Sequence, residues 1–191
     1  ALVLLALVIP FFVPAPDSTP GADPNTGLPW QIETDGQGSS SVFGLTLGVS
    51  TLGDARSRWG NDVEIGIIAA PGEVGALEAY YAQVPLGFVL GKVILTIDLP
   101  QETIGAMRER AIRAEHMEST TRKIKLHPDD LNLAENAPIG AISVIPTVNL
   151  DEATLIQRFG TPEERVAVSE KRTHLLYPAR GLDVEIGRAH V

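Results

Sequence analysis

Residues 50–60 have the sequence STLGDARSRWG, and residues 150–160, one hundred positions later, have the sequence LDEATLIQRFG. Each stretch begins with residues of the type that cap helix N-termini, and each ends in an arginine, an aromatic residue and a glycine at the same spacing. Glycine commonly follows the last turn of a helix. Because β-rich sequence follows both stretches, the pair predicts a duplicated unit in which a short helix precedes an antiparallel sheet.

The first expected unit covers residues 42–99. A short entry strand is expected at 42–48, a helix from Ser50 or Thr51 to Arg58, and β-branched or alternating strands at 63–70, 76–84 and 88–99. Gly91 predicts a bulge or bend in the last of these strands. The pattern indicates a three-stranded antiparallel meander packed on the helix.

Residues 100–146 are expected to connect the two units. Pro100 favours a helix start, and an apolar stripe predicts that this helix continues to about His116. A strand at 122–126, a short helix at 131–136 and a buried strand at 139–145 follow. The second unit is expected at 147–185, with strands near 165–168, 173–177 and 182–185, and its sheet is expected to be truncated.

The chain opens on an apolar run, residues 1–13. Crossing the hydrocarbon core takes roughly 20 helical residues, so this run is interpreted as the remaining part of a truncated membrane anchor. The alternative is a signal-peptide core, but cleavage after Ala15 would leave Pro16 at the new terminus. We therefore expect an uncleaved helical anchor separate from the domain core.

Residues 14–41 are rich in proline, glycine and serine, which predicts a disordered spacer between membrane and domain. Residues 14–55 contain several acids but no lysine or arginine, a composition typical of a translocated flank. We therefore expect a single-pass inner-membrane protein whose soluble domain lies on the periplasmic or extracellular side. Trp30 is expected to tether the spacer to the domain, and a partner-binding role is the alternative.

At the other end, residues 186–191 (IGRAHV) resemble the translation of a short-read sequencing adapter. They are interpreted as an artefact that follows the last natural strand.

Composition narrows the possible functions. The net charge is −9, which disfavours a nucleic-acid partner. The chain has no cysteine, so it has no disulfide, no cysteine-ligated metal and no lipid-modified cysteine. Aromatic residues make up 5% of the chain, too few to suggest stacking platforms for nucleic acid or carbohydrate.

The sequence offers no catalytic constellation. His116, His127 and His174 are scattered, and no phosphate-binding loop or paired-histidine motif is present. The acidic pairs 129–130 and 151–152 are adjacent in sequence, so their side chains diverge on a helix. We expect no catalytic, cofactor-binding or metal-binding residues, and a protein that is not an enzyme. The alternatives are a small-ligand site between the two units and a hydrolase with a dispersed carboxylate site.

One local feature reverses the sign of this acidic chain. Six of its fifteen lysines and arginines fall within eighteen residues, on an expected basic helix and the strand after it. An ordinary solvated surface is one interpretation, because acids alternate with these residues. The sharper interpretation is a site for an acidic partner protein or anionic lipid headgroups. The candidate residues are Arg108, Arg110, Arg113, Arg122, Lys123 and Lys125.

A helix with the pattern Leu-x-x-Ala-x-x-x-Arg-aromatic-Gly followed by a meander resembles the repeat of the SmpA/OmlA (BamE-like) and β-lactamase-inhibitor-protein-like folds. The second copy carries the resemblance most clearly, in residues 158–163 and 175–183. The resemblance implies an α+β fold and a binding or assembly module of the bacterial envelope with an unidentified envelope protein as partner. It transfers no contact residue to this chain, which also lacks the cysteine of the lipoprotein members.

Overall fold

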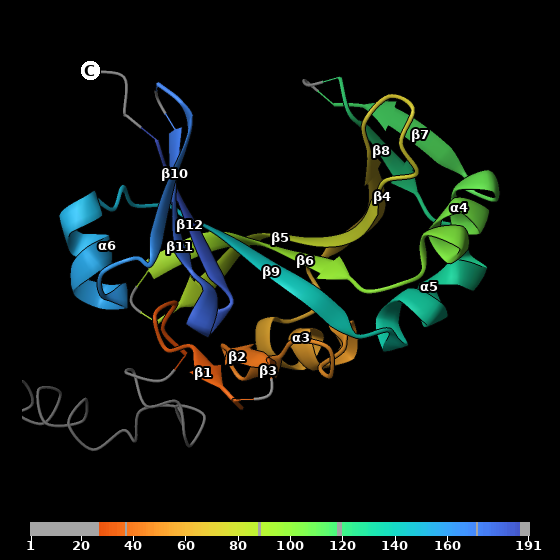
Figure 1. Cartoon of the computed structure of the whole chain (residues 1–191). Helices are drawn as coiled ribbons and strands as arrows, with labels where there is room; N and C mark the ends of the chain where they lie inside the picture. The colour runs from red at the N-terminus through yellow and green to blue at the C-terminus, as the bar shows by residue number, and fades with distance from the viewer. Residues whose placement is uncertain (1–26, 37, 88, 118–119, 171, 188–191) are drawn as a thin grey trace, which may run out of the picture.

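The structure is a computed structural model that describes residues 27–36, 38–87, 89–117, 120–170 and 172–187 (Figure 1). The expected anchor, residues 1–13, lies outside these ranges, as do the first half of the expected spacer and residues 188–191. None of the helices within the described ranges is long and apolar enough to span a bilayer. The described chain has an α+β fold with three antiparallel sheets.

The two helices predicted from their caps are both present. Helix α3 (Leu52–Trp59) begins after Thr51, which forms a capping box with Asp54. Helix α6 (Glu152–Phe159) begins after Asp151, whose carboxylate accepts a hydrogen bond from the Thr154 N–H at 2.7 Å. Hydrogen bonds from the side chain and then the backbone of Thr154 lower the pKa of Asp151. The sequence favours Asn149 as the cap, with Asp151 in the first turn; this prediction was wrong, because the carboxylate of Asp151 reaches the Thr154 N–H and Asp151 is itself the cap.

Each of these helices ends at a glycine in the same backbone conformation. Gly60 and Gly160 both have φ near 87° and ψ near −175°, a region that a side chain disfavours. The carbonyl oxygens of these glycines accept hydrogen bonds from Tyr81 and Tyr177 at 3.4 and 3.0 Å. Each tyrosine comes from the second strand of the meander that follows its helix.

The large sheet has six strands, in the order β7-β8-β4-β5-β6-β9. Its centre is the predicted meander, β4 (Glu64–Ala69), β5 (Ala76–Leu86) and β6 (Val89–Ile97). The bulge lies on β5, between Tyr81 and Val84, and Gly91 on β6 faces it instead of forming it. The prediction of a three-stranded sheet was therefore too small, because strands from the connecting region extend both of its edges.

The connecting region differs most from its prediction. Helix α4 (Gln101–Glu109) ends seven residues before His116, and Arg113–His116 form strand β7, which pairs with β8 (Arg122–Lys125). The backbone hydrogen bonds that residues 113–116 form with β8 favour a strand, and they prevail because the intrinsic preference of these residues for a helix is weak. Helix α5 (Pro128–Asn136) begins directly after its cap His127, three residues earlier than the start expected at residue 131. Strand β9 (Ile139–Pro146) is a half-exposed edge strand, not the buried strand expected.

The three helices α3, α4 and α5 all pack on one face of the large sheet. Their buried side chains share one core with the buried residues of the central strands. The opposite face curves inward and forms the floor of a cup, with β4, β8 and β7 rising on one side and the second unit on the other (Figure 1). We call it the concave face. Members of the shared core include Leu52, Ala55, Ile104, Met107, Ala134, Leu77, Ala79 and Tyr81.

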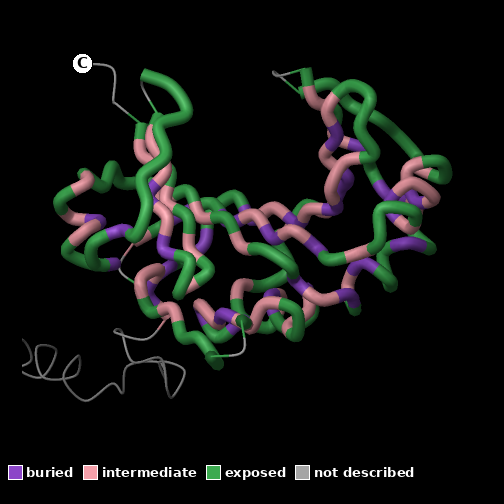
Figure 2. Tube along the Cα trace, viewed as in Figure 1, coloured by how far each residue is buried: buried purple, intermediate pink, exposed green. Residues whose placement is uncertain are grey.

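The second unit has its own small core. Strands β10 (Glu164–Ser169), β11 (Arg172–Tyr177) and β12 (Leu182–Gly187) form a three-stranded meander, and a 3-10 turn (Pro178–Arg180) joins the last two strands. Helix α6 covers one face of this sheet: its Leu155 and Phe159 form a buried cluster with Leu175 and Tyr177 of β11. Residues 186 and 187, expected to lie beyond the last natural strand, pair with β11 as part of β12. The far tips of both sides of the cup are exposed (Figure 2).

The structure corrects the prediction of a disordered spacer for the part of residues 14–41 that it describes. Residues 33–34 (β1) and 40–42 (β2) form a small sheet with β3 (Leu45–Thr46). Leu28 is buried, and Ser40 donates a hydrogen bond to the Arg180 carbonyl oxygen at 3.0 Å. Trp30 packs on the second core, and the guanidinium carbon of Arg158 lies over the Trp30 ring, 4.6 Å from the ring centroid. This polar segment folds because its few apolar residues pack against the two cores.

Strands β2 and β3 also replace the single entry strand expected at 42–48. Phe43 and Gly44 form the two-residue turn between them, both with positive φ. Such turns match the twist of the flanking strands, but an aromatic residue with φ of 56° is unusual. The Phe43 side chain is 3% exposed and contacts Trp59 edge-on, so its burial offsets the strained backbone.

Candidate interaction surface

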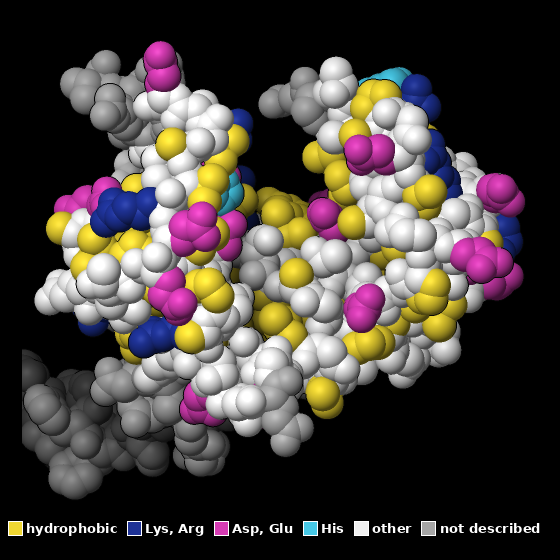
Figure 3. Space-filling model, in the orientation of Figure 1, with side chains coloured by type: hydrophobic (Ala, Val, Ile, Leu, Met, Phe, Trp, Pro, Cys, Tyr) yellow, Lys and Arg dark blue, Asp and Glu magenta, His cyan; other side chains and the backbone are white. Residues whose placement is uncertain are grey.

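The concave face is lined by alternate residues of the central strands. On β5 these residues flank the buried Leu77, Ala79 and Tyr81, and the register with β6 and β9 continues the same face across the sheet. Within the described residues, the helices that cover the large sheet all lie on its other face. Figure 3 shows the resulting hollow, with apolar side chains on its floor. The face includes Glu78, Tyr80, Ile94, Thr96, Ser143 and Ile145.

Strands β7 and β8 form one side of the cup, and we call them the basic ribbon. Lys125 and Lys123 of β8 pair across the ribbon with Arg113 and Glu115 of β7, and this alternation places all four on the concave side. Lys123 forms an ion pair with Glu64, and Arg113 with Glu115 at 3.2 Å. No carboxylate pairs with Lys125 among the described ion pairs, so this side of the ribbon retains positive charge.

The helix side of the ribbon contains a separate open hollow of about 260 Å³. Arginine and small apolar residues line it, and no acidic side chain belongs to the lining. Arg108 comes from α4, Arg113 from β7 and Arg122 from β8. The full lining is Arg108, Ala111, Ile112, Arg113, Ala114, Arg122 and Ile124.

Not every predicted basic residue belongs to a binding surface. Arg110 donates to the carboxylate of Asp130 at 2.5 Å, and this contact raises the pKa of Arg110. The Asp130 side chain is 5% exposed, so Arg110 is its charge partner at the edge of the core. An Arg110→Glu substitution would bring two like charges together there. The contact thus assigns Arg110 a structural role and makes it unsuitable for testing a surface.

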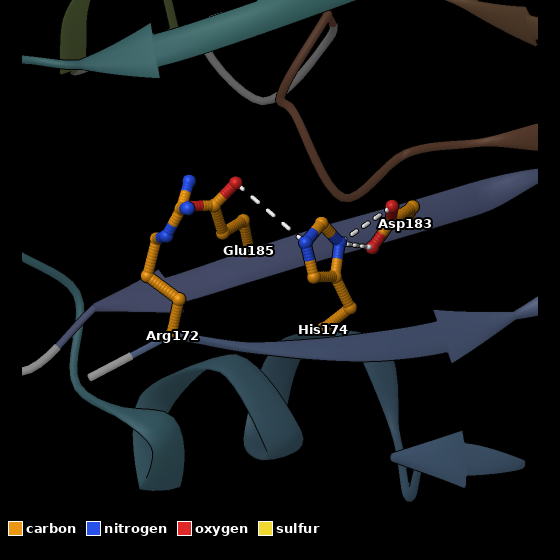
Figure 4. Close-up of polar contacts among 4 residues, drawn as sticks. All are labelled: Arg172, His174, Asp183 and Glu185. Carbon is orange, nitrogen blue, oxygen red and sulfur yellow. Dashed lines mark hydrogen bonds and ion pairs between the residues drawn. The ribbon is translucent and has the colours of Figure 1, made fainter. Parts of the chain in front are cut away.

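A polar cluster that the sequence did not reveal lies on the face of β11 and β12 opposite α6 (Figure 4). The Nδ1 atom of His174 lies 2.8 and 2.9 Å from the two carboxylate oxygens of Asp183, and its Nε2 lies 3.7 Å from Glu185. Arg172 also contacts Glu185, at 3.7 Å. Once β11 and β12 are paired, strand alternation places Arg172, His174, Asp183 and Glu185 on one face, but the sequence alone does not give the pairing register.

This cluster resembles part of a catalytic triad, in which an aspartate orients a histidine. In a triad the second nitrogen of the histidine faces a nucleophile, whereas Nε2 of His174 faces the Glu185 carboxylate. The geometry is therefore that of a partly exposed ion-pair network. Within the described ranges, no three histidine, aspartate or glutamate residues gather in a way that could hold a metal ion.

The two acidic pairs that the sequence offered for a hydrolase site, 129–130 and 151–152, do not bring their carboxylates together in one cleft. Asp129 is exposed, whereas Asp130 is turned inward to Arg110. Asp151 caps α6, and Glu152 forms an ion pair with Arg165. Each of these carboxylates has a local structural role.

Glu78 is the acid at the middle of the concave face, and partial burial raises its pKa above the ordinary value of 4.5. Burial disfavours the ionised form in the folded protein. The ionised Glu78 thus destabilises the folded protein. This destabilisation is absent when the pH is below the pKa of Glu78 in the unfolded chain, and it is complete once the pH has risen above the raised pKa of Glu78 in the folded protein. We therefore expect Glu78→Gln to stabilise the protein at pH 7 by less than about 1 kcal/mol, since solvent screens a half-exposed group.

Thermal unfolding at pH 3.5 and pH 7 measures this effect. The two proteins should unfold alike at the lower pH, where Glu78 is protonated in both states. A Glu78→Gln protein that is less stable than the parent at pH 7 would show that the carboxylate forms favourable contacts instead.

The chain was compared with known protein families, with curated proteins and with solved structures. No family model matches the chain, and no curated protein or solved structure matches it either.

Proposed function

We propose that this protein is a non-catalytic interaction module of a bacterial envelope that docks an acidic partner protein on its concave face. One observation carries the proposal: the face left uncovered by the described helices has the basic ribbon at its rim, in a chain of net charge −9. A floor that mixes apolar residues such as Tyr80, Ile94 and Ile145 with polar ones, beside a charged rim, is a composition found in docking surfaces. Lys123, Lys125 and Arg113 would attract the partner and set its orientation.

We further propose that residues 1–13 hold the module at the inner membrane, with its domain on the periplasmic or extracellular side. This proposal rests on the apolar run and on the absence of lysine and arginine in residues 14–55. Because residues 28–34 pack on the domain, the tether between membrane and domain would be shorter than the whole of residues 14–41.

The two α+β units are proposed to be copies of one ancestral unit. Matching caps, matching glycine conformations and the tyrosine that donates to each glycine carbonyl support this proposal. Both aromatic residues of the Arg-aromatic-Gly endings also contact these tyrosines: Trp59 meets Tyr81 at 5.4 Å and Phe159 meets Tyr177 at 6.0 Å between ring centroids.

The docking proposal is tested by the charge reversal Lys125→Glu. Lys125 is exposed on the ribbon and belongs to none of the described ion pairs, so the fold should be retained. A like-charge contact costs several kcal/mol at an interface, so we expect affinity for an acidic partner to fall more than about tenfold and to become less sensitive to salt. The partner is first identified by crosslinking the membrane-bound full chain through a photoreactive residue at position 143.

Arg180→Glu is the matched control, because Arg180 lies in the 3-10 turn of the second unit and, like Lys125, belongs to none of the described ion pairs. It changes the net charge by the same amount. Equal loss of partner with both variants would mean that net charge alone governs capture, and unchanged capture with Lys125→Glu would reject the surface. Retention of the full chain in membranes washed with high salt checks the proposed anchor in the same preparation.

A further inference from the structure

The hollow on the helix side of the basic ribbon has a composition unlike the rest of the surface. Three arginines line it together with four apolar residues, and no carboxylate does so. In a chain with 24 acidic residues and 15 basic ones, such an arrangement concentrates positive potential in a small volume. Guanidinium groups in a concave, partly apolar setting suit an oxyanion better than a neutral ligand, because they offer paired N–H donors.

Arg108 is held in place before any ligand arrives. Its guanidinium donates to the carbonyl oxygen of Glu73 and, at 3.4 Å, to that of Val74, in the turn between β4 and β5. These contacts fix the side chain but leave its charge uncompensated, since a backbone carbonyl is neutral. Less ordering entropy is then lost when an anion binds.

Arg122 and Arg113 supply charge from the ribbon. Arg122 is exposed and has no carboxylate among the described ion pairs, while the partner of Arg113 is the exposed Glu115, across a weak surface contact. Ile112 adds an apolar edge and is 56% exposed. The lining thus combines cations with an apolar wall.

We propose that this hollow binds a phosphate group, either free as a small phosphate ester or as the headgroup of an anionic phospholipid. A phosphate group, close to doubly charged as a monoester and singly charged as the diester of a lipid headgroup, matches the local excess of guanidinium groups, and the volume of about 260 Å³ accommodates it with a small substituent. The site shares Arg113 with the proposed docking surface, whereas Arg122 and Ile124 alternate with the concave-side lysines on β8 and line only the hollow.

The first measurement titrates the full chain, solubilised in a zwitterionic detergent, with inorganic phosphate and follows backbone amide NMR signals. We expect shifts confined to residues 111–114 and 122–124, with a dissociation constant on the order of 1 mM, as befits a small unsubstituted anion. Chloride at equal ionic strength should leave these signals in place. The absence of localised shifts at about 10 mM phosphate would overturn the proposal.

Arg122→Gln is the decisive variant, because no described hydrogen bond or ion pair is lost with the Arg122 side chain, and it should weaken phosphate binding at least about fivefold. Arg165→Gln makes the same charge change outside the hollow and should bind as the parent does. Arg108→Lys keeps the charge but loses the planar fork, so it should also weaken binding. A response that persists unchanged in Arg122→Gln overturns the site.

A second measurement distinguishes the two sources of phosphate. The full chain is mixed with phosphatidylcholine vesicles and with vesicles containing about one third phosphatidylglycerol, so that insertion of residues 1–13 is common to both. Tighter binding to the anionic vesicles that is lost in Arg122→Gln but kept in Arg165→Gln assigns a lipid headgroup. Phosphate binding without this difference assigns a soluble ester.

Discussion

Replacing Phe43 by alanine is expected to lower the free energy of unfolding by about 3–5 kcal/mol, the usual cost of deleting a buried aromatic side chain. The ring is 3% exposed and meets Trp59 at 5.8 Å between centroids, and Trp59 in turn meets Tyr81. Loss of the ring removes the first member of this stack, while the backbone stays in a left-handed conformation. Chemical denaturation of the purified protein measures the change.

Phe43→Gly separates packing from backbone strain. Glycine loses the same ring contacts but adopts φ of 56° without the penalty of about 1–2 kcal/mol that a side chain incurs there. The glycine protein should therefore be more stable than the alanine protein, although glycine ordinarily destabilises a folded chain. If the alanine protein is the more stable of the two, the turn does not hold residue 43 in a strained conformation.

Replacing Phe159 by alanine should destabilise the second unit by about 3–5 kcal/mol while leaving the large sheet intact. Among the residues that the structure describes, Phe159 is one of four buried side chains in that core, and its ring contacts Tyr177. Because the two cores are separate clusters, we expect them to open as separate cooperative units. Native-state hydrogen exchange should show amides of β11 exchanging roughly 150- to 5,000-fold faster, the factor that corresponds to about 3–5 kcal/mol, with amides of β5 and β6 unchanged.

Tyr177→Phe is the milder comparison in the same core. It removes only the hydroxyl group that donates to the Gly160 carbonyl oxygen at 3.0 Å, a loss of about 1 kcal/mol. Faster exchange in both sheets of the Phe159→Ala protein would show that the N-terminal segment, which contacts both units, couples them into one.

The candidate surface could be predicted from sequence only in part. The cluster of positive charge between residues 108 and 125 was visible as composition, and the structure places most of it on the basic ribbon. The predicted strand at 122–126 already implied that Lys123 and Lys125 face one way and Arg122 the other. The expected helix through His116 concealed strand β7, which pairs with this strand and adds Arg113 to the ribbon.

The sequence by itself determined the local elements of this protein. Helix caps at Thr51 and Asp151, the glycines at 60 and 160 and the β-branched runs depend on groups a few residues apart, so their structures follow from local chemistry. Tertiary structure alone decided that residues 113–116 form a strand, that part of the polar N-terminal segment folds, and that Arg110 serves the core. Those outcomes rest on β8, on two apolar cores and on Asp130, partners that come together only when the chain is folded, because no short-range pattern specifies contacts such as that of Ser40 with Arg180.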